Sequence, residues 1–278
     1  MRRFNRSIAV LATLVAAFAL TGCFLAKGLF ERERIWDPAW FGRYEGDGGV
    51  YVVLPDDPTK RTYLVGSFES GSTSVDSYRS ALYPGWGNTL IIGNIALGKN
   101  ETRAAYTLLW PTGPNRFASD WPSCNAEFAG RHHLPRESDT CTLSSLEVAR
   151  TALKAYEDEK AALKLEHQGN VEPQALERRR DHPLSTIGIM ARPGVVNDSE
   201  GVHGALTLLD VPPSSPAGLA GLKRGDVIFA VGSPRPAIGE ELLLRIAVAE
   251  PNSPIDVSFF DGKTKEKRQV TVKTVPLE

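Results

Sequence analysis

Few residues of this chain have types and spacing that could support covalent or metal chemistry, and its 3 cysteines stand out among them. Cys23 directly follows an apolar stretch near the N-terminus, whereas Cys124 and Cys141 lie far along the chain. His132 and His133 lie between these two and could join them in a zinc site. Zinc-binding cysteines usually stand two to four residues apart, a much closer spacing than this one. A structural disulfide between Cys124 and Cys141 is therefore the favoured prediction, and a metal site is the alternative.

A glycine-rich segment from Gly93 to Asn100 nearly matches the phosphate-binding loop Gly-x4-Gly-Lys-Ser/Thr. Asn100 stands where the loop needs a hydroxyl for Mg²⁺, and a strand rather than a helix is expected to follow. Without a helix N-terminus, no group of backbone N–H donors faces a phosphate. We therefore expect a hairpin turn here, and the sequence indicates no cofactor.

The N-terminus has the parts of an export signal, namely a positive start, an apolar run from Ile8 to Leu20 and small residues before a cut. The run is too short and wrongly flanked for a lasting membrane span. Its ending, Leu20-Thr21-Gly22-Cys23, resembles the lipobox of bacterial lipoproteins. The resemblance implies that the signal peptide, residues 1–22, is removed and that Cys23 is acylated, with palmitate among its acyl chains. An ordinary signal peptide that happens to end at a cysteine is the alternative.

The lipobox resemblance also predicts where the protein resides. Several acyl chains hold a protein firmly to a bilayer, since each buried methylene contributes about 0.8 kcal/mol. We therefore expect an extracytoplasmic, lipid-anchored protein in a compartment that permits the disulfide. Phe24 follows Cys23, and by resemblance to enterobacterial lipoproteins the absence of aspartate there favours the periplasmic face of the outer membrane in a two-membrane cell.

The charge balance argues against one class of partner. The formal net charge is −1 at pH 7, and loss of the arginines in the signal peptide makes the mature chain more acidic. Such a balance does not attract nucleic acid. The only basic run, Arg178-Arg179-Arg180, is interpreted as part of a solvated linker. No later stretch has the roughly 18 apolar residues of a membrane span, so the lipid is the only predicted anchor.

Beyond the anchor, the patterns predict a mainly β chain of the α+β class. Residues 23–44 form a tether, which docks on the neighbouring domain or lies at the lipid headgroups, where tryptophans are favoured. Residues 45–168 form an antiparallel β domain that carries the disulfide and ends in one long helix. Its expected strands are Val50–Leu54, Arg61–Phe68, Thr89–Leu97 and Thr102–Trp110.

The helix and the segment after it complete this part of the chain. Ser144 and Glu147 have the spacing of a capping box, and an apolar stripe follows at helical spacing to about Gln168. Residues 169–183 contain glycine, proline and the arginine run, with few apolar side chains. They are predicted to be an interdomain linker.

Residues 184–276 carry the most specific pattern in the chain. Ser215-Pro216-Ala217 is followed by Ala220-Gly221-Leu222-Lys223 and then by Gly225-Asp226-Val227-Ile228. This motif resembles that of the bacterial PDZ domains attached to HtrA proteases. The resemblance implies a small β-sandwich or barrel capped by two helices. It also implies that Leu222 lies in the core and that Asp226 opens a strand, while the glycines occupy turns.

The same resemblance assigns Thr186-Ile187-Gly188-Ile189 to a loop that captures a carboxylate or a peptide turn. Independently of it, a glycine between apolar residues lets successive backbone N–H groups point at one oxyanion. The strand that follows, which includes Met190, offers an edge to which an extended peptide can add as another strand. Leu243 and Ile246 lie three apart on a predicted helix. They are expected to line a pocket for apolar side chains, or else to be plain core.

HtrA proteins join such a module to a trypsin-like protease, which needs an activated serine, a histidine base and a carboxylate. No histidine precedes His132, and Ser67–Ser72 contains one glycine but not the Gly-x-Ser-Gly-Gly arrangement of a protease nucleophile. The sequence therefore predicts a non-catalytic adaptor that binds an extended or C-terminal peptide segment of an exported protein. Its expected partner is an envelope protease or a secretion complex. The alternatives are a hydrolase in the β domain, with the module as substrate clamp, and a structural protein whose groove is filled by its own chain.

Overall fold

The computed structural model describes residues 24–46, 49–70, 72, 74–98, 103–137, 140–160, 174–232 and 235–277. The predicted signal peptide, Cys23 and the predicted end of the long helix (161–168) lie outside the described residues. The chain divides into two compact units. Unit 1 comprises Met1–Trp36, Ser80–Ala96 and Asn100–Ala175, and unit 2 comprises Asp37–Arg79, Leu97–Lys99 and Leu176–Glu278.

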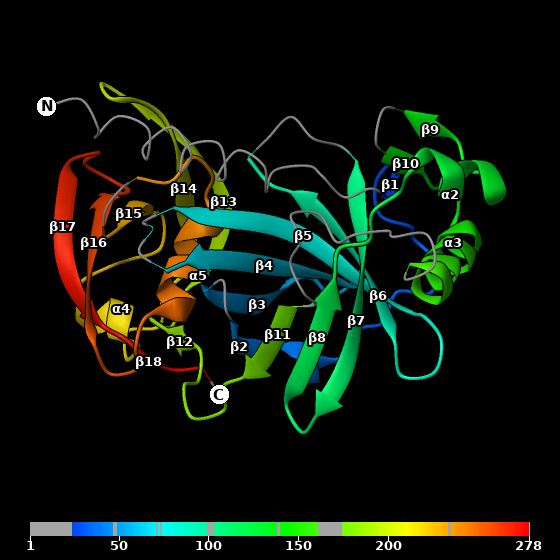
Figure 1. Cartoon of the computed structure of the whole chain (residues 1–278). Helices are drawn as coiled ribbons and strands as arrows, with labels where there is room; N and C mark the ends of the chain where they lie inside the picture. The colour runs from blue at the N-terminus through cyan, green and yellow to red at the C-terminus, as the bar shows by residue number, and fades with distance from the viewer. Residues whose placement is uncertain are drawn as a thin grey trace, which may run out of the picture. The chain divides into compact units, whose positions relative to one another are not determined.

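Most elements of the described residues are strands in antiparallel pairs, and the helices are few (Figure 1). The predicted mainly β class is therefore confirmed. The unit boundaries differ from the expected domains at 45–168 and 184–276, because the division falls inside two strands, β5 (Val75–Pro84) and β11 (Gln174–Arg178). Unit 2 therefore contains the first strands of the expected β domain as well as residues 184–276.

Unit 1 is organised around β7 (Ala104–Gly113). β6 (Leu90–Ala96) pairs with β7 in antiparallel register, with Asn94 opposite Ala105. The other edge of β7 carries two strands in succession. β8 (Arg116–Asp120) pairs with its C-terminal half, and β1 (Phe24–Ala26) pairs with its first two residues. On its far side β1 pairs in parallel with β10 (Thr140–Thr142), which pairs with β9 (Arg136–Glu137).

Two helices cover the core of unit 1. In α2 (Ala126–Arg131) the Asn125 side chain accepts the Phe128 N–H as an N-cap. α3 (Leu146–Glu159) is capped by Ser145, whose hydroxyl accepts the Val148 N–H at 3.2 Å, so the cap lies one residue after the predicted Ser144. The apolar stripe of α3 is buried as its spacing predicted. Its buried residues are Leu146, Ala149, Ala152, Leu153 and Tyr156.

The segment predicted as a tether packs onto the fold over its described part. Phe24 is fully buried, and its ring lies edge-on to Phe128 at 5.9 Å and to Tyr156 at 6.2 Å. The later residues of the segment lie in unit 2, where Pro38–Trp40 forms a short 3-10 helix. Of the two predicted placements of the tether, docking on the domain therefore holds for the described residues, because its aromatic side chains find partners in the core.

Unit 2 contains two ladders of antiparallel strands. In the first, β2 (Gly42–Gly46) lies between β3 (Gly49–Asp57) and β11 (Gln174–Arg178), and β3 continues to β4 (Thr62–Glu69). The second is a five-stranded sheet in the order β13-β14-β15-β16-β17. Its strands are Met190–Asp198, Gly201–Asp210, Val227–Val231, Pro254–Phe260 and Lys267–Lys273. A separate pair joins β12 (Ser185–Thr186) to β18 (Val275–Pro276).

The predicted linker, 169–183, differs from expectation because β11 lies within it. Leu176 pairs with Gly46 and Arg178 with Tyr44, so this stretch is part of a ladder rather than a solvated connection. The arginine run hid the strand, since a strand at a sheet surface tolerates charged side chains on its exposed face. Arg178 still satisfies a backbone group, because its Nη2 donates to Phe41 O at 2.6 Å.

Helix α5 (Glu240–Val248) packs on both ladders of unit 2. Leu242 and Ile246 join the core of the five-stranded sheet, whereas Leu244 and Ala247 join a cluster with Val52, Leu54 and Leu64. The approach to β4 is close, because a β-carbon at Gly66 would lie 2.8 Å from Leu244 Cδ1. The apolar run Leu242-Leu243-Leu244 is thus explained by a helix that is buried on two sides. The second helix, α4 (Pro216–Leu219), is a single turn.

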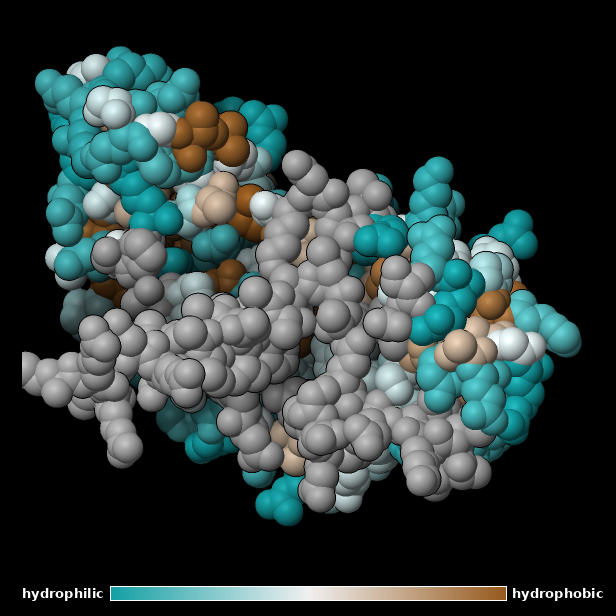
Figure 2. Space-filling view, turned by 45° about the horizontal axis from the view of Figure 1, so that its top comes forward, coloured by the Kyte–Doolittle hydropathy of each residue, from teal (hydrophilic) through white to brown (hydrophobic). Residues whose placement is uncertain are grey.

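On the face drawn in Figure 2, the coloured surface shows hydrophobic residues in small groups among hydrophilic ones. None of the helices in the described residues is long and apolar enough to cross a membrane.

Candidate functional site

The edge of the five-stranded sheet is the element on which the predicted site depends. β13 is the first strand in the order β13-β14-β15-β16-β17, so within the described residues its second side carries no partner strand. Its pairing with β14 runs from Met190 opposite Asp210 to Asp198 opposite Gly201, with a register shift after Met190. Met190 is 59% exposed at the start of this edge. Unpaired backbone N–H and C=O groups on such an edge are suited to a ladder with another chain.

The loop before β13 contains Gly188, the glycine on which the predicted carboxylate site depends. Gly188 has φ +69°, a left-handed conformation that side chains disfavour, and a β-carbon there would lie 2.7 Å from Ser215 Cβ. Its N–H donates to Thr186 Oγ1 at 3.0 Å. The carbonyl of Ile187 accepts the Ala217 N–H at 3.0 Å. The loop is thus fixed to the start of α4, and the Gly188 amide is held by a hydroxyl of the loop itself.

The residues of the Ser215–Ile228 motif have structural roles around this loop. Ser215 caps α4 by accepting the Gly218 N–H at 3.1 Å, and Leu222 is buried in the core of the sheet. Asp226 is buried, and its two carboxylate oxygens accept the N–H groups of Lys223 and Gly262, both at 2.8 Å. One carboxylate therefore ties the turn before β15 to the hairpin after β16.

The predicted site residues divide between surface and core. Thr186 and Ile189 are partly buried, whereas Ile187 and Ile246 belong to the buried core. Leu243 is partly buried between the two apolar clusters of unit 2. Of the residues expected to contact a peptide, Met190 is the one that is widely exposed.

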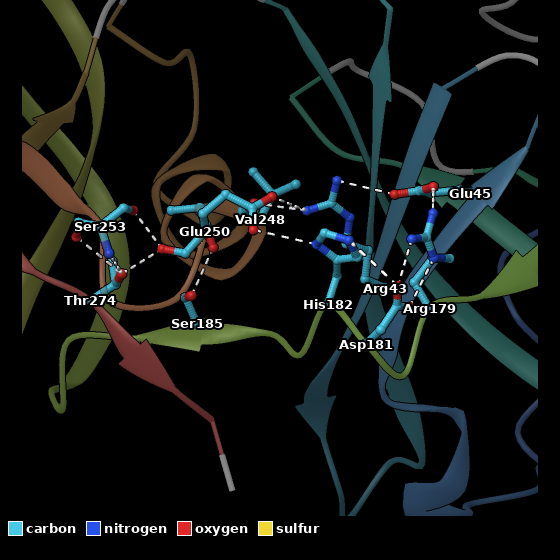
Figure 3. Close-up of polar contacts among 11 residues, drawn as sticks. Arg43, Glu45, Arg179, Asp181, His182, Ser185, Val248, Glu250, Ser253 and Thr274 are labelled. Carbon is cyan, nitrogen blue, oxygen red and sulfur yellow. Dashed lines mark hydrogen bonds and ion pairs between the residues drawn. The ribbon is translucent and has the colours of Figure 1, made fainter.

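A charged network that the sequence did not predict joins β2 to the end of α5 (Figure 3). Arg43 Nη1 lies 3.1 Å from Glu250 Oε1, and Arg43 Nη2 lies 3.2 Å from Glu45 Oε1. Arg179 hydrogen bonds to Glu45 and to Asp181. The hydrogen bond from Arg179 lowers the pKa of Asp181, and the same pair raises the pKa of Arg179. The charges of Arg179 and Asp181 therefore stabilise each other.

The carbonyls at the C-terminal end of α5 are satisfied by side chains from three other segments (Figure 3). Arg43 Nη1 reaches Val248 O at 3.5 Å, and Ser185 Oγ donates to Ala249 O at 2.7 Å. Thr274 Oγ1 donates to Glu250 O, also at 2.7 Å. The last carbonyls of a helix have no partner within it, so these bonds fix where α5 ends. No local sequence signal predicts them, because the donors lie far away in the chain.

Two cysteines and one histidine of unit 1, Cys124, Cys141 and His132, have structural partners. Cys124 and Cys141 form a disulfide with Cα atoms 6.0 Å apart. His132 Nε2 lies 2.9 Å from Glu159 Oε1, and its ring packs on Phe128. Within the part of the chain that the structure describes, no group of three or more histidine, cysteine and acidic side chains could hold a metal ion. At the segment that resembled a phosphate-binding loop, β7 follows β6 and pairs with it.

Comparisons with known proteins give structural similarity only. No protein-family model matches the chain, and no curated protein matches it. A solved structure described as the HtrA-type protease AlgW with decapeptide is similar over 83% of this chain and 83% of its own, with 10% identity and a TM-score of 0.30. The serine endoprotease from Yersinia pestis is similar over 84% of this chain and 96% of its own, with 13% identity and a TM-score of 0.28.

Proposed function

We propose that this protein is a lipid-anchored extracytoplasmic adaptor that binds extended or C-terminal peptide segments of exported proteins. The binding element is a PDZ-like module at residues 184–276, and the guest peptide adds as a strand to β13. The open side of β13 within the described residues is the observation that carries the proposal. Backbone hydrogen bonds along that edge supply affinity for any extended segment, and neighbouring side chains select among segments.

The loop at Gly188 supports a terminal position for the guest chain. Its left-handed glycine lies two residues before the first residue of β13, near the place where an added strand would end. The Gly188 N–H is held by Thr186 Oγ1, and a guest carboxylate would replace that hydroxyl as acceptor. Thr186, Ile187, Gly188, Ile189 and Met190 form the contact segment, and Leu243 is the side chain of α5 nearest to solvent among the predicted pocket residues.

The anchor in this proposal is Cys23, acylated after removal of residues 1–22. It is supported by the Leu20-Thr21-Gly22-Cys23 sequence and by a disulfide between the two remaining cysteines, which fits an oxidising compartment. In a two-membrane cell the periplasmic face of the outer membrane is the proposed location. An envelope protease or a secretion complex is the proposed partner.

The proposal is tested by photocrosslinking in intact cells with the full-length protein. A crosslinking amino acid replaces Met190, and the control replaces Val202, which is 64% exposed on β14. We expect Met190 to capture a discrete set of exported proteins through extended segments, and Val202 to capture none of them. Identical adducts at both positions, or none at Met190, would contradict strand addition at β13.

Measurements of enzymatic turnover and of Met190 adducts on the full-length protein distinguish two other functions from this one. A hydrolase in the upstream strands would show turnover that a substitution there abolishes while Met190 adducts persist. A structural protein with a filled groove would give no adducts at Met190 and no turnover.

A further inference from the structure

The first described residue of the chain belongs to the core, which constrains any anchor placed before it. Phe24 is fully buried and opens β1, and Leu25 and Ala26 are buried as well. Cys23 is the residue directly before Phe24, and consecutive Cα atoms lie about 3.8 Å apart. An acyl group on Cys23 would therefore bring the fold around β1 to the bilayer without a spacer.

The strand register of unit 1 shows which residue lies beside Phe24. β8 and β1 follow one another along the same edge of β7. Asp120 is opposite Leu108 in the first pairing, and Leu25 is opposite Ala105 in the second. Only two residues of β7 lie between those two pairings. The chain therefore leaves β8 at Trp121 next to the place where it enters β1 at Phe24.

Trp121 reaches solvent between two buried residues. It is 40% exposed, although Asp120 before it is buried and Pro122 after it is buried as well. Asp120 Oδ2 accepts from Lys160 Nζ at 3.3 Å, so its charge is compensated. The segment then reaches Cys124, whose disulfide partner Cys141 pairs with Phe24 in the sheet. A partly exposed tryptophan therefore lies beside the start of β1.

We propose that Trp121 forms a membrane-contact face of unit 1 beside the buried start of β1, occupied by the phospholipid headgroup region that holds the acylated Cys23. This inference rests on the lipid anchor of the proposed function. Tryptophan is favoured at the boundary between headgroups and acyl chains, because its ring is apolar and its N–H finds a polar partner there. Unit 1 is therefore held against the bilayer by two contacts rather than by the lipid alone.

The test uses the full-length, natively processed protein reconstituted into phosphatidylcholine vesicles, with or without brominated acyl chains that quench nearby tryptophans. We expect a drop in fluorescence with brominated lipid, and we expect Trp121→Phe to remove more than half of that drop. Trp86→Phe is the matched control, because Trp86 is a partly buried tryptophan of unit 1 packed against the core, and it should leave the drop unchanged. Insertion of ten glycine and serine residues after Cys23 should reduce the drop as well.

Each outcome bears on the proposal. If the acylated protein shows no fluorescence drop with brominated lipid, the membrane-contact face is wrong, and a protein partner at Trp121 would fit instead. If Trp121→Phe shows the same fluorescence drop as the parent protein, the membrane-contact face is also wrong. Neither result contradicts the lipid anchor. Mass spectrometry that finds Cys23 without acyl groups overturns both. Peptide capture at Met190 is measured separately and is unaffected by either result.

Discussion

Arg43 in β2 donates a hydrogen bond to Glu250 across 207 residues of sequence, with Nη1 3.1 Å from Oε1. The same guanidinium contacts Glu45 at 3.2 Å and Val248 O at 3.5 Å. It joins a strand of the first ladder in unit 2 to the end of α5, the helix that also packs on the five-stranded sheet. Unit 2 is thus stabilised by a polar contact at one end of α5 and by apolar contacts along it.

Replacing Arg43 tests this relationship. Arg43→Met should lower the free energy of unfolding by about 1–3 kcal/mol, because it leaves acceptors without their charged donor. The measurement is urea unfolding. Lys60→Met is the matched control, since Lys60 forms an exposed ion pair with Asp57 at 3.3 Å and such pairs contribute less than about 1 kcal/mol. Equal losses in the two variants would mean that the Arg43 contacts contribute little.

Local patterns predicted the parts of the fold that depend on neighbouring residues. The stripe of α3 was predicted from spacings of a few residues, and the turn residues of the Ser215–Ile228 motif from a local family resemblance. The contacts of Arg43 with Glu250 and of Arg179 with Glu45 join distant segments, and nothing near either arginine indicates its partner. β1 was missed because it has three residues, too few for a period to be visible.

For the candidate site too, the sequence predicted local features but not the features that depend on tertiary packing. Sequence reasoning selected Gly188 as a glycine between apolar residues, and its φ is +69° in the structure. The burial of Ile187 and Ile246 was not predictable, because an apolar residue on a helix or strand fits a pocket and a core equally well. Only the packing of α5 against the sheet shows whether such a residue lines a pocket or lies in the core.

Gly188 should be more sensitive to substitution than a glycine with space around it. Gly188→Ala places a β-carbon 2.7 Å from Ser215 Cβ in a left-handed conformation, whereas Gly221 has φ +93° and nothing within 4 Å. Gly221→Ala should cost about 1 kcal/mol from backbone strain alone. Gly188→Ala should cost more and should also weaken peptide capture at Met190. Thermal unfolding and the crosslinking yield are the measurements, and equal losses of stability would contradict the close contact with Ser215.

Thr186 should control how strongly the loop prefers a free carboxylate. Thr186→Val removes the acceptor that holds the Gly188 N–H at 3.0 Å and leaves that amide available to a ligand. We expect the ratio of Kd values for amidated and free-acid forms of one captured peptide to rise several-fold in the variant. Fluorescence anisotropy with the full-length protein measures both constants. An unchanged ratio would show that the guest carboxylate does not use this amide.

Asp57 should show a shifted titration that depends on the turn after β3. Hydrogen bonds from the Thr59 hydroxyl and then from the Lys60 backbone lower the pKa of Asp57 from 3.8 to about 2. A lowered folded pKa means that the contribution of this carboxylate is complete above pH 3.8 and is lost as the pH falls to about 2. Thr59→Ala should therefore raise the Asp57 pKa toward 3.8, as followed by NMR titration of the carboxyl carbon. Asp57→Asn should unfold with a weaker dependence on pH over the same range.

The disulfide should contribute a large part of the stability of unit 1, because it joins the segment before α2 to the strand beside Phe24. Cys124 and Cys141 stand 17 residues apart, and closing a loop of that size contributes roughly 3 kcal/mol through the unfolded state. Cys124→Ala with Cys141→Ala should lower the Tm of the full-length protein by several degrees. Reductant should lower the Tm of the parent protein toward that of the double variant and leave the variant unchanged. A variant that still responds to reductant would show that the effect arises outside this bond, and a parent that does not respond would show that the bond contributes little.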